Sequence, residues 1–133
     1  VKFKSFNNTK ENSVISMWYL LHEISKKNTK RVIKYFHSLH HYFPNSHLII
    51  GEITRIENRL LSKYRYRSIM PEFLFFHDIS GQGVLTWPEY KFILKKIPYD
   101  LVRQENFDVL KVGNKIIPTG FIWHLKPKKE SRL

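Results

Sequence analysis

The amino-acid sequence predicts a mixed α/β fold in which parallel strands are followed by an antiparallel strand pair. Two short apolar runs, Val14–Leu21 and His47–Ile53, enclose a helical stripe, and two longer strand-like segments close the chain. The chain has 133 residues, of which 42% are hydrophobic and 15% aromatic. This is enough for one domain with a core and too little for two. We therefore expect a single domain over residues 1–133, with a lead-in at 1–12 and a basic tail at 126–133.

The first unit reads as strand, helix, strand. Val14–Leu21 is apolar on both faces and eight residues long, which is typical of a strand buried on both sides, with a short buried helix as the alternative. Asn28-Thr29 is a plausible helix cap. One helical face follows it, formed by Val32, Phe36, Leu39 and Phe43, and Pro44 ends the helix. Because His47–Ile53 comes directly after, we expect the two strands to be parallel.

The second part of the chain reads as helix, helix, strand, strand. Pro71–His77 is rich in Phe and predicts a helix, and Thr86 with Glu89 three residues on is a capping box for the next one. That helix carries the apolar stripe Tyr90, Ile93, Leu94 and Ile97 and ends at Pro98. The final strands, Tyr99–Leu110 and Lys115–Leu125, are joined by a hairpin-like signal around Gly113.

The composition excludes several classes of function. Without cysteine, disulfides, thiolate zinc sites and a Cys nucleophile are excluded. The five glycines form neither G-x-G-x-x-G nor a phosphate loop. No apolar run approaches the roughly 20 residues of a membrane span, so we expect no membrane partner. The opening residues are polar and basic, so we expect no signal peptide and a cytoplasmic location; since the first residue is Val1 rather than Met, we expect further sequence upstream.

Several segments resemble the second half of a class I S-adenosylmethionine-dependent methyltransferase of the O-methyltransferase type. They are SVISMWYLLHEIS, VIKYFHSLHHYFPNSHLIIGEITR, FLFFHDISGQGVLTWPEYKFILKKI and IIPTGFIWHLKP, which together cover nearly the whole chain. In that family an apolar strand ends in His-Asp or His-Glu, here His22-Glu23, and a second strand ends as Gly51-Glu52 does here. The resemblance implies the C-terminal half of a Rossmann-like sheet with helices on both faces.

The family's first half is what this sequence lacks. The Gly-rich turn after the family's first strand, and the acid after its second strand that holds the ribose, are both missing. We therefore expect S-adenosylmethionine to be the cofactor of the complete fold, without measurable binding to this chain alone. The missing half would come from upstream sequence or another chain, and a chain without it would be inactive.

His22 and Glu52 are the candidate catalytic residues. Ligands of open α/β sheets bind outside the carboxyl ends of the strands, and both residues lie where an expected parallel strand ends. A neutral His can accept a proton from a substrate hydroxyl, and a carboxylate can orient its ring. In the O-methyltransferases that this segment resembles, the matching His is the general base and the acid positions it. The alternative is that His22 caps the next helix or binds a backbone carbonyl, while Glu23 is expected to be a surface acid of a first helical turn.

The remaining candidates rest on weaker signals. Asn7, at a position where the family often has an acid near the adenine, and Leu20 are candidate cofactor contacts. Three residues near Gly81 could line a substrate pocket or simply form a turn, namely His77, Asp78 and Gln82. We expect no metal site, because His37, His40 and His41 are better explained as a solvated helix face.

The sequence thus predicts methyl transfer to an oxygen or nitrogen acceptor, which could be a small molecule or a nucleic acid. The main alternative is a non-catalytic nucleic-acid-binding module, since the net charge is +12 and the basic run Arg55–Arg67 includes Tyr64 and Tyr66. A third is an interaction subunit. The apolar strand Val14–Leu21 finds only one neighbour in this chain, so we expect a second chain or a second copy to cover its other edge.

Overall fold

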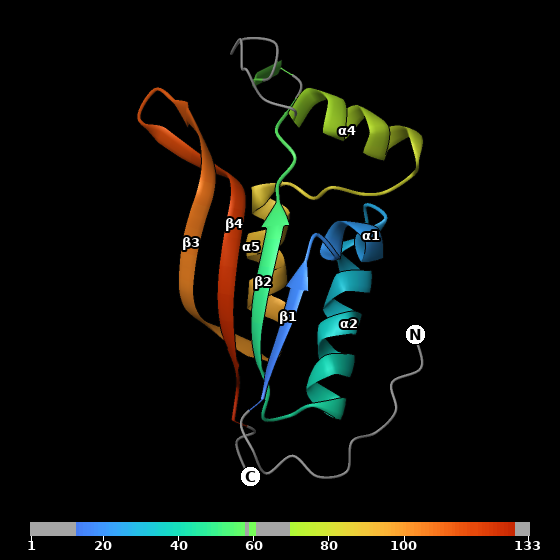
Figure 1. The fold of residues 1–133 in the computed structure, drawn as a ribbon, viewed down its shortest axis with the longest axis vertical. Coiled ribbons are helices and arrows are strands. Elements are labelled where there is room, and N and C mark those ends of the chain that lie inside the picture. The colour runs from blue at the N-terminus through green and yellow to red at the C-terminus, as the bar shows by residue number, and fades with distance from the viewer. Residues whose placement is uncertain (1–12, 58, 61–69, 130–133) are drawn as a thin grey trace.

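The computed structural model describes residues 13–57, 59–60 and 70–129 (Figure 1). Its elements are, in chain order, β1 (Val14–Trp18), α1 (Leu21–Ser25), α2 (Thr29–Tyr42), β2 (His47–Ile53), α4 (Met70–Ile79), α5 (Trp87–Lys96), β3 (Tyr99–Val112) and β4 (Lys115–Pro127). The strands form one sheet in the order β1-β2-β4-β3. β1 and β2 are parallel, and β4 runs antiparallel to both β2 and β3, so the predicted arrangement of strands is confirmed.

Local sequence signals explain where the helices begin. The Oδ1 atom of Asn28 accepts a hydrogen bond from the backbone N–H of Lys30 at 3.0 Å, which satisfies one free donor of α2. At α5, the carboxylate of Glu89 accepts hydrogen bonds from the backbone N–H and the hydroxyl of Thr86, at 2.7 and 2.8 Å. The capping predictions are therefore confirmed, and both helices begin where the sequence indicates.

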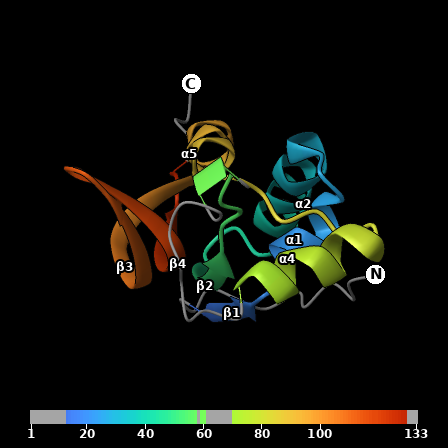
Figure 2. The ribbon, with the colours of Figure 1, turned by 90° about the horizontal axis from the view of Figure 1, so that it is seen from above.

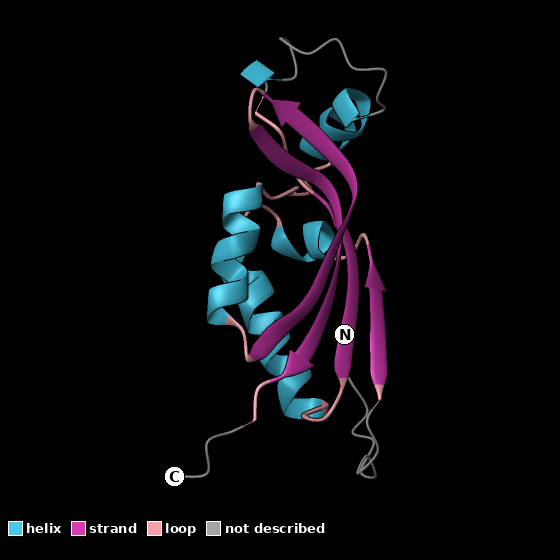
Figure 3. Cartoon of the chain, turned by 90° about the vertical axis from the view of Figure 1, so that its left-hand side faces the viewer, coloured by secondary structure: helices cyan, strands magenta, loops and turns pink. Residues whose placement is uncertain are grey.

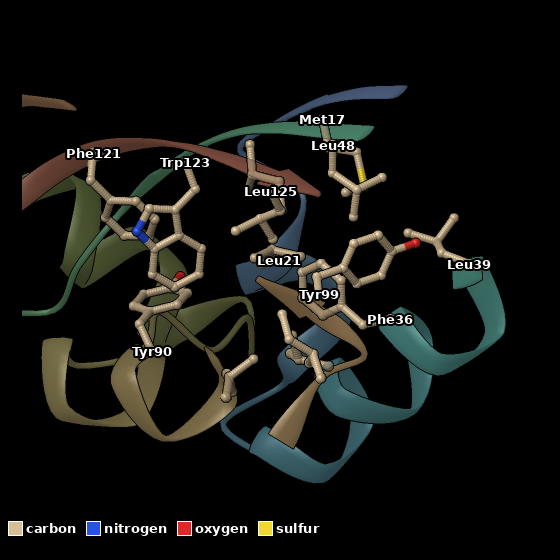
Figure 4. Packing of buried hydrophobic residues seen from close by; sticks show 14 of the residues in the cluster. Met17, Leu21, Phe36, Leu39, Leu48, Tyr90, Tyr99, Phe121, Trp123 and Leu125 are labelled. Atoms are coloured by element: carbon tan, nitrogen blue, oxygen red, sulfur yellow. The ribbon is translucent and has the colours of Figure 1, made fainter. Parts of the chain in front are cut away.

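The core lies between one face of the sheet and the helices α1, α2 and α5 (Figure 4). Alternate residues of β2 and β4 point into it, and the stripes of α2 and α5 meet them. The main contributors are Leu48, Ile50, Phe121, Trp123 and Leu125 from the sheet and Phe36, Leu39, Tyr90 and Ile93 from the helices. Each fully buried apolar side chain of this size contributes about 1.5–3 kcal/mol. This packing fixes the helices against the sheet.

The strand β1 differs from the prediction in length and in burial. It ends at Trp18, since Tyr19 adopts a positive φ of 53° and Leu20 leads into α1. The predicted burial of Val14–Leu21 on both sides is wrong, because Val14 and Trp18 are 66% and 51% exposed while Met17 faces the core. The apolar run is therefore a strand with one buried face, followed by a turn and the first turn of a helix.

The helices that pack on the sheet lie on one side of it (Figures 2 and 3). α1, α2 and α5 cover that face, and α4 lies across the end at which β1 and β2 terminate. Helices on both faces were predicted, but within residues 13–57, 59–60 and 70–129 no helix packs against the opposite face. In the described part of the chain, that face is therefore open, and so is the outer edge of β1, which pairs with β2 alone.

Candidate active site at the ends of β1 and β2

Glu52 lies on the buried face of β2. Because side chains alternate along a strand, Glu52 follows Leu48 and Ile50 into the interior, and none of its surface is exposed. Its Oε2 accepts hydrogen bonds from the backbone N–H groups of Leu21, at 2.8 Å, and His22, at 3.4 Å. Its Oε1 accepts one from the backbone N–H of Ile53 at 3.0 Å. The carboxylate therefore binds the free donors at the start of α1 and fixes that helix to the end of β2.

The His22 ring completes this arrangement. Its Nδ1 lies 3.0 Å from Oε1 of Glu52, and the side chain is almost fully buried, with 3% of the residue exposed. Since an ionised carboxylate can only accept, Nδ1 donates, and in the neutral ring Nε2 carries the lone pair. Nε2 lies 3.7 Å from Oε1 of Glu23. The predicted meeting of His22 and Glu52 is confirmed, and His22 directs its ring to the carboxylate rather than to a backbone carbonyl.

The helix α4 covers His22. The ring of His77 meets that of His22 edge-on with 4.8 Å between centroids, and it stacks on Phe73 at 3.7 Å. Nδ1 of His77 donates to the backbone carbonyl of Phe73 at 2.7 Å, so the neutral ring keeps its lone pair on Nε2. Of the three residues near Gly81 proposed as a pocket, His77 is the one in ring contact with His22. Phe73 was missed, because a Phe in an apolar helix reads as core.

Asp78 and Gln82 instead bind neighbouring side chains. Asp78 forms a two-pronged pair with Arg55 at 2.7 and 2.8 Å and lies 3.1 Å from Nζ of Lys27. Hydrogen bonds from these two cations hold the pKa of the Asp78 carboxyl well below its usual 3.8. Gln82 donates to the carboxylate of Glu23. Asp78 thereby ties the end of α4 to the segment after β2 and to the turn after α1.

Tyr90 is a further group beside this site that the sequence stripe had placed simply in the core. Its ring packs against Phe121 and Trp123, at 5.0 and 5.9 Å between centroids, and its hydroxyl has no hydrogen-bond partner among the described residues. Burial raises the pKa of Tyr90 well above 10, and the negative charge of Glu52 adds to the shift. Its hydroxyl therefore stays protonated beside the buried carboxylate.

The described residues do not fit S-adenosylmethionine by themselves. A cofactor of this size needs a close approach to backbone, and Gly51, at the end of β2, is covered by the indole of Trp18, whose Cε3 would lie 2.2 Å from an added Cβ. Leu20, the other predicted cofactor contact, is partly buried and packs against the core. Asn7 lies outside the described residues, so its predicted cofactor contact stays a prediction.

The histidine face of α2 shows no arrangement for a metal. His37 is exposed, with Nε2 3.1 Å from the carbonyl of Lys96, and the ring of His40 packs edge-on against Tyr99. Across the described part of the chain, no three His, Asp or Glu side chains are grouped to hold a metal ion. Of the basic run, Arg55 and Arg59 are described, and the part from Lys63 to Arg67 with its two tyrosines lies outside. None of the described helices has the length and apolar character to cross a membrane.

Comparison with known proteins gives a fold likeness without a sequence match. No family model and no curated protein matches the chain. The mitomycin 7-O-methyltransferase MmcR aligns with 86% of this chain, with a TM-score of 0.47 and 15% identity. OxaC, solved with sinefungin and meleagrin, aligns with 95%, with a TM-score of 0.50 and 11% identity. The chain spans 29% of the length of each. The fold of this chain is thus similar to part of the OxaC fold, and the fold resemblance predicted from the sequence is confirmed.

Proposed function

We propose that this chain is the catalytic half of a methyltransferase that moves a methyl group from S-adenosylmethionine to an oxygen or nitrogen acceptor. The observation that carries the proposal is the buried contact between His22 and Glu52, placed where two parallel strands end. The fold likeness to OxaC, whose structure holds sinefungin, supports it. The cofactor supplies the methyl group, and polypeptide outside the described residues binds it.

The residues of this chain handle the proton. S-adenosylmethionine would supply the methyl group by breaking its methyl carbon–sulfur bond, with S-adenosylhomocysteine as the leaving group. The proton of the acceptor hydroxyl would pass to Nε2 of His22, the lone-pair nitrogen set by the Nδ1 bond to Glu52. The carboxylate of Glu52 stabilises the resulting imidazolium, and its backbone partners keep it in place. His22 is then the general base and Glu52 a positioning residue. A neutral nitrogen acceptor can attack through its lone pair before it loses a proton, so it depends less on proton removal by His22.

Access to His22 requires α4 to shift. Phe73 and His77 lie over the ring, and 3% of His22 is exposed. Both are half-buried and lie on a helix whose end is held by the Asp78 ion pairs. In this proposal the acceptor enters between α1 and α4, with His77 as a substrate contact.

A second polypeptide segment covers the open side of the sheet in this proposal. The outer edge of β1 lacks a strand neighbour in the described chain, and sheets with parallel strands are ordinarily covered on both faces (Figure 3). The exposed Val14 and Trp18, together with the half-buried Ile49 and Ile122, give that face an apolar character. The occupant is the missing cofactor-binding half, either joined to this chain or separate, and a second copy of the chain is the alternative.

Two experiments test the proposal. Equilibrium dialysis of the chain with labelled S-adenosylmethionine should show no measurable binding, and the complete protein should bind it. In the complete protein, His22→Ala should lower methyl transfer to a hydroxyl acceptor about 10²–10⁴-fold without changing cofactor affinity. His41→Ala, which removes an exposed histidine of α2, is the matched control.

Transfer that survives His22→Ala within about threefold would overturn the assignment. Salt-sensitive RNA binding without any transfer would instead support the nucleic-acid-binding alternative.

A further inference from the structure

A separate hollow is lined by residues other than His22 and Glu52. Its volume is about 540 Å³, within the range of small-molecule sites. Three parts of the chain form it: the segment after β2, the N-terminal turns of α5, and the tip of the β3–β4 hairpin. We call this hollow the hairpin cleft. Nothing in the proposed methyl transfer uses it.

The hairpin cleft is strongly cationic. Arg55, Arg59, Lys91 and Lys115 line it, against the single acid Glu57. Arg55 is paired with Asp78, and Arg59 lies 3.7 Å from Glu57. Lys91 and Lys115 are exposed, and neither has an ion-pair partner among the described residues. They come from different elements, one from α5 and one from β4.

Part of the lining of the cleft is apolar. Ile56 is 5% exposed, Ile117 is half-buried, and Trp87 is a half-buried aromatic wall. A bare inorganic ion would leave this surface unfilled, whereas a planar apolar body would cover it. Two ammonium groups without ion-pair partners among the described residues, carried by two different elements, fit a dianion with several acceptor oxygens better than a single carboxylate.

We propose that the hairpin cleft binds a nucleoside monophosphate unit, with the phosphate between Lys91 and Lys115 and the base against the apolar wall at Trp87. The unit is either a free nucleotide or the 5′-phosphorylated end of a single-stranded nucleic acid, because both present a phosphate monoester and a ring. This inference goes beyond methyl transfer and does not depend on it.

The test uses AMP and the full chain, read by the indole N–H signals of its three tryptophans in NMR. Trp87 lines the cleft, whereas Trp18 lies on the open face and the Nε1 of Trp123 donates to Gln104 at 3.1 Å. AMP should shift the Trp87 signal saturably. Adenosine and inorganic phosphate should each bind at least about tenfold more weakly than AMP, because each lacks one half of the contacts. An unmoved Trp87 signal at millimolar AMP would overturn the proposal.

Charge reversal locates the phosphate. Lys91→Glu with Lys115→Glu should weaken AMP binding about tenfold or more. The matched control is Lys95→Glu with Lys111→Glu, which changes the same charge on α5 and on the hairpin outside the cleft. Equal weakening by both pairs would contradict a site and indicate general charge attraction. AMP binding is measured on the chain alone without S-adenosylmethionine, so failure here is distinct from failure of the methyl-transfer proposal.

A short single-stranded RNA with a 5′-phosphate distinguishes the two sources of the ligand. If nucleic acid is the partner, RNA should bind more tightly than AMP and lose that affinity in the Lys91→Glu, Lys115→Glu variant, with a steep salt dependence. If the partner is a free nucleotide, RNA should bind no more tightly than AMP at this cleft. Both results keep the nucleoside monophosphate site, and RNA binding that is indifferent to the two substitutions would contradict it.

Discussion

Replacing Glu52 with Gln tests how the candidate site is built. The substitution keeps the size of the side chain and turns one acceptor oxygen into an NH₂ donor. In the native protein Oε2 faces the N–H of Leu21, and Oε1 faces the N–H of Ile53 and Nδ1 of His22. With the amide in one orientation its NH₂ meets Ile53, and in the other it meets Leu21. One buried backbone donor is therefore left without an acceptor in either case.

The expected cost follows from those contacts. A buried donor without a partner costs about 1–3 kcal/mol. The bonds that remain lose the assistance of the carboxylate charge, which adds about 1 kcal/mol. Glu52→Gln should therefore lower the free energy of unfolding by about 2–4 kcal/mol. With an m-value of about 2 kcal/mol/M in urea, the midpoint falls by about 1–2 M.

Urea unfolding followed by far-UV circular dichroism measures this loss. The control is Glu23→Gln, which makes the same chemical change at the residue after His22 on α1, where the side chain is 47% exposed. We expect that variant to stay within about 0.5 kcal/mol of the native protein. If Glu52→Gln proved no less stable than Glu23→Gln, the carboxylate would not be the anchor of α1, and the positioning of His22 would need another explanation.

Three further substitutions probe the surroundings. Asp78→Asn should lower the free energy of unfolding by about 1 kcal/mol or less at neutral pH, since the pair with Arg55 is partly exposed. The pKa of Asp78 lies below 3.8 in the folded protein, so the difference in stability between the native protein and the variant should shrink as the pH falls below 3.8. Burial raises the pKa of Tyr99 to about 12, so the folded state loses stability relative to the unfolded state as the pH rises from 10 toward 12. In unfolding curves measured at alkaline pH, Tyr99→Phe should remove the share of this loss that comes from Tyr99. Gly83→Ala would place a Cβ 1.8 Å from the backbone N of Lys27, so thermal unfolding should reveal a loss of about 3 kcal/mol or more, and an unchanged melting temperature would contradict this packing.

Local signals were sufficient for much of the fold. The Asn28 cap and the reciprocal pattern of Thr86 and Glu89 act within a single helical turn, so their outcome does not depend on distant residues. The meeting of His22 with Glu52 was also predictable, because the carboxyl ends of neighbouring parallel strands lie at one edge of a sheet. The contribution of α4 to the site was not predictable from the sequence. The stacking of His77 on Phe73 is a local contact within α4, but the covering of His22 by His77 joins segments more than fifty residues apart, which no sequence period encodes.

The misjudged burial of β1 has a different cause. Apolar residues on both faces of a strand indicate that burying both faces would be favourable in free energy. They do not indicate whether the polypeptide that covers the second face belongs to the same chain. Val14 and Trp18 are exposed here while Met17 is buried, and the indole of Trp18 folds over Gly51. The strand therefore has the composition of the middle of a sheet and the position of an edge. That mismatch is the physical reason to look for the remaining contacts of β1 in polypeptide outside the described residues.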